Sequence, residues 1–330
     1  MAVNLTDVLE KYDLNIYGIK KTRGAYAVDT DRGLRLLCEC NKGDSVVDML
    51  HSLQQCLAEQ GFGNVDFIVK NAEGNLVTED EEHRRYILKE WFDAKECDIT
   101  DEEQVLSCVR QLAKLHNVFG TVRERKRYTG RLYDMAGEYD RHTRELRKTS
   151  GYIRNKRVKN EFELLAGNNI GKFVEDASLA SRMLCENDYE ERLKAAKENM
   201  ELCHGDYNYH NVLFNNDFVA VTDFENVGCG MQIGDLYTFM RKILEKCDWD
   251  IEFGRRMLYE YINIKPRTCR DMNILAAFFI YPEKLWKVIN VYFNRKKSLV
   301  LQKNMDKLKV CIRQRELKNL FVQELLQTKV

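Results

Sequence analysis

The sequence contains very little proline and carries no net charge. Only 2 of its 330 residues are proline and 18 are glycine, which leaves little room for a disordered segment or a flexible linker. Its 52 lysines and arginines are balanced by 52 aspartates and glutamates. A nucleic-acid-binding protein usually carries excess positive charge over a whole face. We therefore expect no nucleic acid among the partners.

Long apolar runs are absent as well. The longest, residues 274–281, has eight residues, whereas a membrane-spanning helix needs about 20. The first eight residues lack the basic start and the apolar stretch of an export signal. On these grounds we expect neither a membrane partner nor secretion.

The eleven cysteines are scattered from Cys38 to Cys311, and no two of them form a CxxC pair. Cys38 and Cys40 are close neighbours, but no second pair is placed to complete a zinc site. An odd number of scattered thiols is typical of a reducing compartment, where cysteines stay free. The composition thus predicts a cytoplasmic protein.

The first 92 residues predict a small antiparallel sheet with one helix. Between residues 45 and 60 apolar side chains recur at helical spacing, and Gly61 is placed to end that helix. The other β-favouring runs are separated by turn-rich stretches. The predicted strands are residues 15–18, 25–29, 34–40, 67–70 and 86–92.

From Thr100 onward the apolar residues follow a helical period. Thr100 and Glu103 have the spacing of a capping box, which predicts that a helix begins there. The remainder of the chain is helical in character except for an interruption at residues 203–226. The sequence therefore predicts an α+β protein with two lobes. The small strand-rich lobe is expected at residues 1–92 and the larger, mostly helical lobe at residues 93–330.

Positive charge is concentrated in residues 121–160, which hold 13 lysines and arginines against 5 aspartates and glutamates. Helices with a solvated basic face account for such a stretch, and this is the interpretation we prefer. The alternative is a surface for an anionic partner or an acidic substrate.

The interruption of the helical region contains the polar residues that best fit a catalytic role. Two short β-favouring runs flank a turn at residues 215–217, which predicts a hairpin. A hairpin brings Asn211, at its entry, close to Asp223, at its exit. Asp206 lies five residues before Asn211, in the loop that leads into the hairpin. The alternative is a surface loop that is merely rich in turn-forming asparagine and aspartate.

Phosphoryl transfer from ATP requires such a set of side chains. A carboxylate orients the acceptor hydroxyl and takes its proton, and further oxygen ligands hold Mg²⁺ against the nucleotide phosphates. By position, Asp206 is the expected base, and Asn211 and Asp223 are the expected metal ligands. Glu225 is placed to reach a second metal ion or a water. His204 is expected to brace the loop through hydrogen bonds.

These residues resemble the catalytic and metal-binding loops of the aminoglycoside phosphotransferase and choline kinase group. The resemblance lies in His204-Gly205-Asp206 with Asn211, in Asp223-Phe224-Glu225, and in Leu-Ala-Lys-Leu-His at residues 112–116. It implies a two-lobed protein-kinase-like fold, with ATP and Mg²⁺ as cofactors and a small-molecule acceptor. It also places Glu90 and Phe92 at the hinge that contacts the nucleotide.

Two further stretches resemble the CotS family of spore coat proteins from endospore-forming Firmicutes. They are Glu-Trp-Phe-Asp-Ala-Lys-Glu at residues 90–96 and Tyr-Pro-Glu-Lys-Leu-Trp-Lys at residues 281–287. The whole resemblance runs over roughly residues 15–300. It implies spore coat proteins as partners, and a location in the cytoplasm of the mother cell with incorporation into the coat.

The small lobe departs from the pattern of the group. A kinase-like lobe has a lysine on its third strand, paired with a helix glutamate, which grips the α- and β-phosphates. Alignment puts Cys38 at the lysine and Gln55 at the glutamate, so both members of the ion pair are expected to be missing. The candidates for a substitute cation are Lys20, Lys21, Arg23 and Lys42, and nothing in the sequence selects among them.

Two functions follow. The first is a Mg-ATP-dependent phosphotransferase that acts on a small-molecule hydroxyl, supported by the complete set of Asp206, Asn211 and Asp223. The second is a kinase-fold scaffold of the spore coat with little or no turnover, supported by Cys38 and Gln55. A cation within reach of Cys38 would favour the enzyme. A nucleotide cleft filled by large side chains such as Tyr26 or Phe92 would favour the scaffold.

Overall fold

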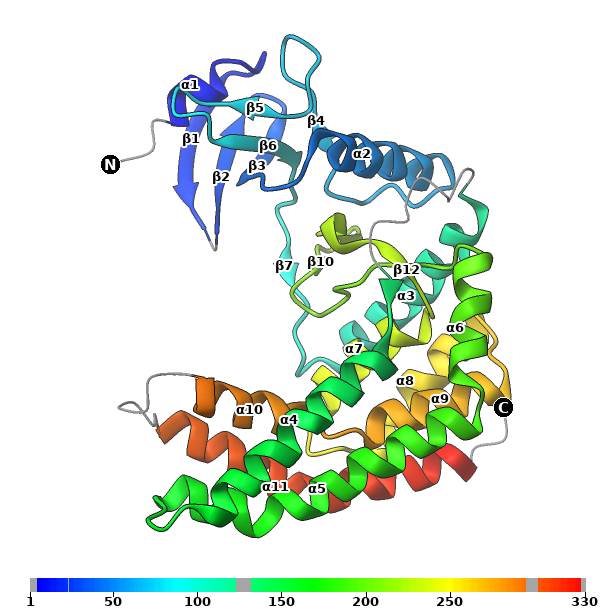
Figure 1. Ribbon diagram of the computed structural model, residues 1–330. Coiled ribbons are helices and arrows are strands. Elements are labelled where there is room, and N and C mark those ends of the chain that lie inside the picture. The colour runs from blue at the N-terminus through cyan, green and yellow to red at the C-terminus, as the bar shows by residue number, and fades with distance from the viewer. Residues whose placement is uncertain (1–4, 23, 123–131, 295–301, 328–330) are drawn as a thin grey trace. The chain divides into compact units, whose positions relative to one another are not determined.

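The computed structural model describes residues 5–22, 24–122, 132–294 and 302–327 (Figure 1). Their packing groups them into two compact units. The first comprises Met1–Arg131 and Leu202–Cys229, and the second comprises Leu132–Glu201 and Gly230–Val330. The first unit includes the segment with the predicted hairpin, which packs among the N-terminal elements. Val65, for example, forms a β-bridge with Val221. The lobe boundary expected at residue 92 stays a prediction.

The first unit contains an antiparallel sheet with the strand order β1-β2-β3-β6-β4, and β5 pairs with β6 beside this path. All five predicted strands are present, and the short β5 is an addition. The strands are β1 (Ile16–Lys21), β2 (Ala25–Thr30), β3 (Gly33–Glu39), β4 (Ile68–Val69), β5 (Thr78–Glu79) and β6 (Arg85–Glu90).

The two faces of this sheet have different surroundings. One face is covered by the short helix α1 (Leu5–Leu9), whose side chains join Val28, Leu37 and Leu88 in a buried apolar cluster. Side chains alternate between the faces along each strand. Because Leu36 pairs with Lys89 across β3 and β6, and Cys38 pairs with Ile87, Lys89 and Cys38 share the opposite face.

Helix α2 (Asp44–Glu59) is the helix predicted from the apolar period. It buries Leu50, Leu53 and Leu57. Gly61 follows it with φ +81°, a left-handed conformation that glycine adopts without strain. The amide of Gly61 donates to the Ala58 carbonyl, which satisfies one of the last helical acceptors. The prediction that Gly61 ends this helix is confirmed.

Helix α3 (Glu102–Thr121) begins one residue later than the capping box predicted. The cap is Asp101, whose carboxylate accepts from the backbone N–H groups of Glu103 and Gln104. Thr100 instead donates its N–H and hydroxyl to Asp98. Asp101 takes the capping position instead of Thr100, because its negative carboxylate is also stabilised by the positive end of the helix dipole.

The predicted hairpin is confirmed. Its strands are β10 (Val212–Phe214) and β11 (Val219–Val221), paired in antiparallel register, and β7 (Lys95–Glu96) adds a third strand beside β10. Before and after the hairpin, β9 (Leu202–Cys203) pairs with β12 (Gly228–Gly230). This short pairing joins the two ends of the segment with the candidate site.

The second unit is almost entirely helical, as predicted. All but the last residue of the longest apolar run in the sequence lie in α9, which packs against α5, α7 and α11 and is a core helix. None of the helices in the described part of the chain is both long enough and apolar enough to cross a membrane. The helices are α4 (Met135–Asn155), α5 (Glu161–Glu186), α6 (Tyr189–Glu198), α7 (Ile233–Leu244), α8 (Ile251–Ile264), α9 (Cys269–Ile280), α10 (Glu283–Asn294) and α11 (Gln302–Gln327); β8 (Leu132–Tyr133) precedes them.

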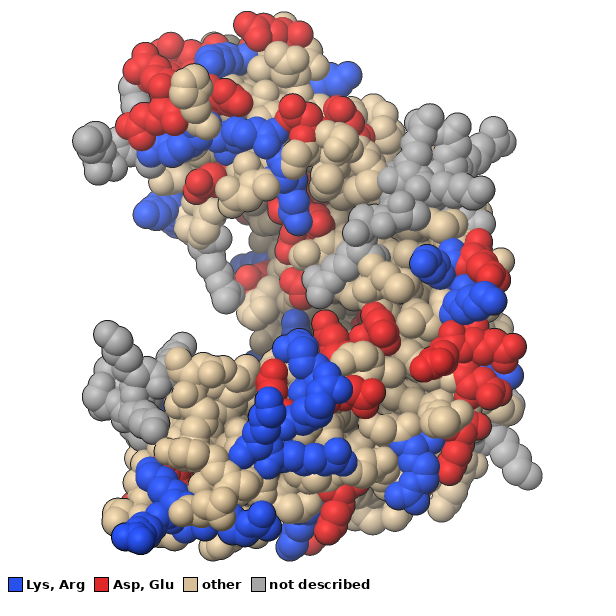
Figure 2. All heavy atoms as spheres, in the orientation of Figure 1, with Lys and Arg blue, Asp and Glu red and all other residues tan. Residues whose placement is uncertain are grey.

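The basic segment at residues 121–160 falls largely on α4. Figure 2 shows lysine and arginine side chains gathered over this helix, and Arg141, Arg144 and Lys148 are among its exposed residues. Residues 123–131 of the segment lie outside the described part of the chain. The exposure agrees with a solvated basic face, while the anionic partner stays a prediction.

Candidate functional site

Asn211 joins the two other polar residues predicted for the catalytic loop. Its side-chain Nδ2 donates to the backbone carbonyl of Asp206 at 3.0 Å and to Oδ2 of Asp223 at 3.4 Å. The carboxylate of Asp206 accepts in turn from Nδ2 of Asn208 at 3.1 Å. The loop and the hairpin exit thus meet at Asn211, as the hairpin predicted. Their catalytic roles are taken up below as a proposal.

Two fully buried residues, His204 and Tyr207, hold the loop through hydrogen bonds. The backbone N–H of Asp206 donates to Nδ1 of His204 at 3.3 Å, so the other ring nitrogen, Nε2, donates to the carbonyl of Thr222 at 3.1 Å. The hydroxyl of Tyr207 donates to the carbonyl of Cys108 in α3 at 2.7 Å. His204 therefore bonds to the loop through one ring nitrogen and to the end of the hairpin through the other.

Asp223 has an unusual backbone conformation at the exit of β11. Its φ and ψ are 66° and 56°, the left-handed region that costs a non-glycine residue about 1 kcal/mol or more. Its N–H donates to Oδ2 of Asp66 at 3.1 Å. Burial raises the pKa of the Asp223 carboxyl, the charge of Glu225 adds to this rise, and Lys89 opposes it.

Lys89 is the principal residue of the site that the sequence did not reveal. It lies on β6 and is 4% exposed. Its ammonium Nζ lies 3.1 Å from Oδ2 of Asp66 and 3.0 Å from Oε1 of Glu225. Burial alone would lower the pKa of Lys89, but the two carboxylates outweigh burial and raise it. Lys89 is therefore a fixed cation beside Asp223.

Cys38 lies on β3, and Lys89, which was not among the substitute cations considered from the sequence, places a positive charge near it. The Lys89 charge acts on the Cys38 thiol, and burial raises the thiol pKa to about 11, so Cys38 stays protonated. Of the substitute cations considered from the sequence, Lys20 and Lys21 are exposed on β1. Lys42 lies in the loop after β3, and Arg23 lies outside the described residues.

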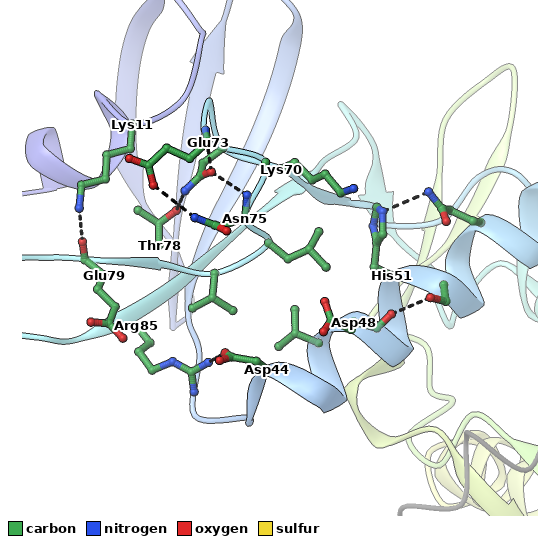
Figure 3. Close-up of a pocket in the computed structure, with 17 residues that line it drawn as sticks. Lys11, Asp44, Asp48, His51, Lys70, Glu73, Asn75, Thr78, Glu79 and Arg85 are labelled. Carbon is green, nitrogen blue, oxygen red and sulfur yellow. Dashed lines mark hydrogen bonds and ion pairs between the residues drawn. The ribbon is translucent and has the colours of Figure 1, made fainter.

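Of the two adjacent glutamines of α2, the one aligned with the helix glutamate is exposed and its neighbour is buried. Gln55 is exposed on α2, and its side-chain nitrogen lies 3.1 Å from Nε2 of His51. Both residues line a polar pocket of about 810 Å³ between α2 and the β4–β5 segment (Figure 3). The buried residue is Gln54, whose side chain accepts from the Ile68 N–H at 3.1 Å and donates to the Asp66 carbonyl at 2.8 Å.

Tyr26 does not lie on the sheet face that carries Lys89. Tyr26 packs on the opposite face with the cluster beneath α1. The β2 residues that share the face of Cys38 and Lys89 are Ala25 and Ala27. Phe92 packs against Phe218 of the hairpin turn, with 5.5 Å between the ring centroids.

The predicted hinge contact with a nucleotide stays a prediction. Glu90 ends β6 with an exposed side chain. Its backbone N–H donates to the Phe67 carbonyl at 2.7 Å.

The donor set fits a hard divalent cation that is completed by a ligand. Asn211 uses its side-chain nitrogen for the bonds described above, so its oxygen is available together with the Asp223 carboxylate. In the described ranges no three His, Cys, Asp or Glu side chains form a metal-binding group. Mg²⁺ commonly binds through one or two protein oxygens plus substrate phosphates. The residues therefore fit Mg²⁺ bound together with a nucleotide.

Comparison with solved structures shows where this fold occurs. The chain is similar to an aminoglycoside phosphotransferase from Alicyclobacillus acidocaldarius, with a TM-score of 0.88 and 19% identity over 98% of this chain and 95% of that one. It is also similar to spectinomycin phosphotransferase, solved with ADP and spectinomycin, with a TM-score of 0.64 and 14% identity over 97% of both chains. Amicoumacin kinase, solved with AMP-PNP and Ca²⁺, has a TM-score of 0.61 and 10% identity, covering 96% of this chain and 92% of that one.

These likenesses confirm the kinase-like fold. A sequence-family model, described as the phosphotransferase enzyme family, matches residues 25–264. The matched range spans most of the chain and contains β2, β6, the loop with Asp206 and the hairpin. The chain therefore belongs to the phosphotransferase enzyme family.

Proposed function

We propose that this protein transfers the terminal phosphoryl group of ATP, with Mg²⁺, to a hydroxyl of a small-molecule acceptor. The observation that carries the proposal is the position of Asn211, which bonds both to the loop of Asp206 and to the carboxylate of Asp223. Nucleotides bound to two of the similar structures support it.

In this proposal each side chain has one task. Asp206 orients the acceptor hydroxyl and takes its proton as the bond to phosphorus forms. Asn211 and Asp223 hold Mg²⁺, which when bound neutralises charge on the phosphates. His204 and Tyr207 keep the loop in place, because both are fully buried and bonded to fixed backbone carbonyls.

We further propose that the protein is a CotS-type spore coat protein, made in the mother cell and associated with other coat proteins. The support is the resemblance of residues 90–96 and 281–287 to that family. Residues 281–287 make packing contacts in the second unit. Tyr281 stacks on Tyr139 at 3.6 Å between ring centroids, and Trp286 donates to Glu145 at 2.7 Å.

A catalytically inactive coat scaffold is the second candidate. It is favoured by Cys38, which occupies β3 where an active kinase-like lobe is expected to have a lysine. Lys89 weakens this candidate, because a buried cation lies beside Cys38 and Asp223 after all.

Thermal unfolding with and without Mg-ATP separates the two candidates. A ligand present at about 100 times its Kd adds roughly 2.7 kcal/mol, which raises Tm by a few degrees in a chain of this size. We expect a Mg-dependent rise in the wild type that Asp223→Ala abolishes. The matched control is Asp217→Ala, which removes an exposed aspartate in the turn of the same hairpin. No rise in the wild type at millimolar Mg-ATP would favour the scaffold.

A second measurement tests the chemistry. Asp206→Asn removes the proposed base and leaves the proposed metal ligands in place. We expect this variant to retain the Mg-ATP-dependent rise in Tm and to lose ATP turnover by about 100-fold or more. Equal turnover in the variant and the wild type would reject Asp206 as the base.

A further inference from the structure

The ammonium group of Lys89 on β6 can reach the position that the ammonium group of a lysine on β3 would occupy. Strands β3 and β6 are neighbours, with Leu36 opposite Lys89 and Cys38 opposite Ile87. Cys38 and Lys89 are therefore diagonal neighbours on one face, about 7–8 Å apart at their Cα atoms. The four-carbon stem of a lysine spans such a separation. A lysine on either strand can therefore place its ammonium group on this face of the sheet.

The two carboxylates that hold Lys89 differ in mobility. Asp66 is 1% exposed, and its Oδ2 also accepts the backbone N–H of Asp223, while Gln54 holds the Asp66 backbone. Glu225 has a side chain that is 32% exposed and belongs to a three-residue 3-10 turn. Asp66 is therefore a fixed counter-ion, whereas Glu225 can turn away into solvent.

Lys89 retains capacity for one more acceptor. An ammonium group donates up to three hydrogen bonds. In the described part of the chain its acceptors are the oxygens of Asp66 and Glu225. Release of Glu225 would leave two donor directions for a ligand.

Resting on the proposed function, we propose that Lys89 on β6 binds the phosphates of the nucleotide, in place of a lysine on β3. Asp66 is its permanent partner. Glu225 occupies the phosphate position in the nucleotide-free protein and leaves when the nucleotide enters. The carboxylates of Asp66 and Glu225 contact the Lys89 ammonium, and the Asp223 carboxylate interacts with it electrostatically. A nucleotide polyanion should therefore bind this site more tightly together with Mg²⁺ than without it.

Calorimetric titration of two probes tests the phosphate contact. Mg-ADP carries the phosphates and adenosine lacks them. We expect Lys89→Met to weaken Mg-ADP binding by about 10- to 100-fold, the effect of one hydrogen bond to a charged group, and to leave adenosine binding unchanged. Lys70→Met, which removes an exposed lysine of the same unit, should bind Mg-ADP like the wild type.

Two double variants keep the test valid if Lys89→Met alone does not fold. Lys89→Met/Asp66→Asn removes both members of the buried pair, so it avoids an unpaired carboxylate and should still bind Mg-ADP weakly. Lys89→Met/Cys38→Lys returns the lysine to β3, and we expect it to recover most of the lost affinity. Recovery supports the shared position, and failure to recover in a folded variant overturns it.

The outcomes separate this inference from the function on which it rests. If the wild type binds no Mg-ADP, the proposed function fails. If the wild type binds Mg-ADP and the folded Lys89 variants bind it equally well, only the role of Lys89 is overturned. Equal weakening of Mg-ADP and adenosine would also overturn it, because the loss would then not concern the phosphates.

Discussion

The carboxylate of Asp66 lies 3.1 Å from Nζ of Lys89, and the same oxygen accepts the backbone N–H of Asp223, also at 3.1 Å. One buried carboxylate thus joins the lysine of β6 to the proposed metal ligand after β11. Because Asp223 has a left-handed backbone, this bond also helps to hold a strained residue in place. The position of Asp223 depends on a residue that precedes β4.

Removal of Lys89 should destabilise the first unit strongly. Lys89→Met leaves the buried Asp66 carboxylate without its cation, and breaking a buried pair in this way costs about 3–5 kcal/mol. Urea unfolding followed by circular dichroism measures the loss. In Lys89→Met/Asp66→Asn both charges are gone, so most of the stability should return. A double variant as unstable as Lys89→Met would show that the buried charge is not the cause.

Asp223→Asn should raise stability in the absence of metal and nucleotide. The pKa of Asp223 is higher in the folded protein than in the unfolded chain, chiefly through burial, so ionisation of this residue opposes folding. The penalty is absent below the ordinary aspartate pKa and develops as the pH rises through the raised value. The gain from Asn should therefore be largest near neutral pH.

Paired melting curves of the wild type and Asp223→Asn between pH 4 and pH 8 measure this dependence. A difference in Tm that is independent of pH would reject ionisation as its origin. The variant should also lose the rise in Tm with Mg-ATP, since it lacks the metal-binding carboxylate. A variant that is more stable but no longer binds Mg-ATP would show that the Asp223 carboxylate serves ligand binding and not folding.

The hairpin and the convergence of Asn211 with Asp223 could be predicted from the sequence. Both depend on short-range signals: two β-favouring runs, a turn rich in Asn and Asp, and fixed spacing. Lys89 could not be found this way, because its role depends on which strand lies beside β3. That pairing is a long-range property, and a lysine near the end of a predicted strand gives no sign of burial.

The burial of individual side chains on α2 and the shortest elements could not be predicted for local reasons. Gln54 and Gln55 are adjacent in α2, and one residue turns a helix by about 100°. A shift of one residue in an alignment therefore exchanges a buried side chain for an exposed one. The elements α1, β5 and β7 have five residues or fewer, which is too short for a periodic signal.

Glu225→Gln distinguishes a displaceable partner of Lys89 from a second metal ligand. A neutral amide binds the ammonium less strongly than a carboxylate, so Lys89 is freed more easily. We expect ADP without Mg²⁺ to bind several-fold more tightly to the variant, and the dependence of ADP affinity on Mg²⁺ to decrease. Titration of ADP in EDTA and in excess Mg²⁺ measures both effects.

The opposite result would assign Glu225 to the metal. In that case affinity for Mg-ADP should fall about tenfold while affinity for ADP in EDTA stays unchanged. Asp217→Gln, an exposed carboxylate of the hairpin turn, is the matched control for a general change in charge.

Gln54→Ala and Gln55→Ala form a matched pair on one helix turn. Gln54 is 2% exposed, and its amide satisfies both the Asp66 carbonyl and the Ile68 N–H. Its removal leaves two backbone groups without their partner, so we expect a loss of about 2–3 kcal/mol. Gln55 is exposed, and its removal should change stability by no more than about 0.5 kcal/mol.

The same pair tests whether α2 supports the site through Asp66. If it does, Gln54→Ala should also weaken Mg-ADP binding, because it loosens the residue that holds both Lys89 and Asp223. Gln55→Ala should bind Mg-ADP like the wild type. Unfolding curves and calorimetry on both variants give the two readouts. Equal effects of the two substitutions would contradict the assignment of Gln54 as the inward-facing residue, and a loss of stability without a loss of affinity would confine its role to folding.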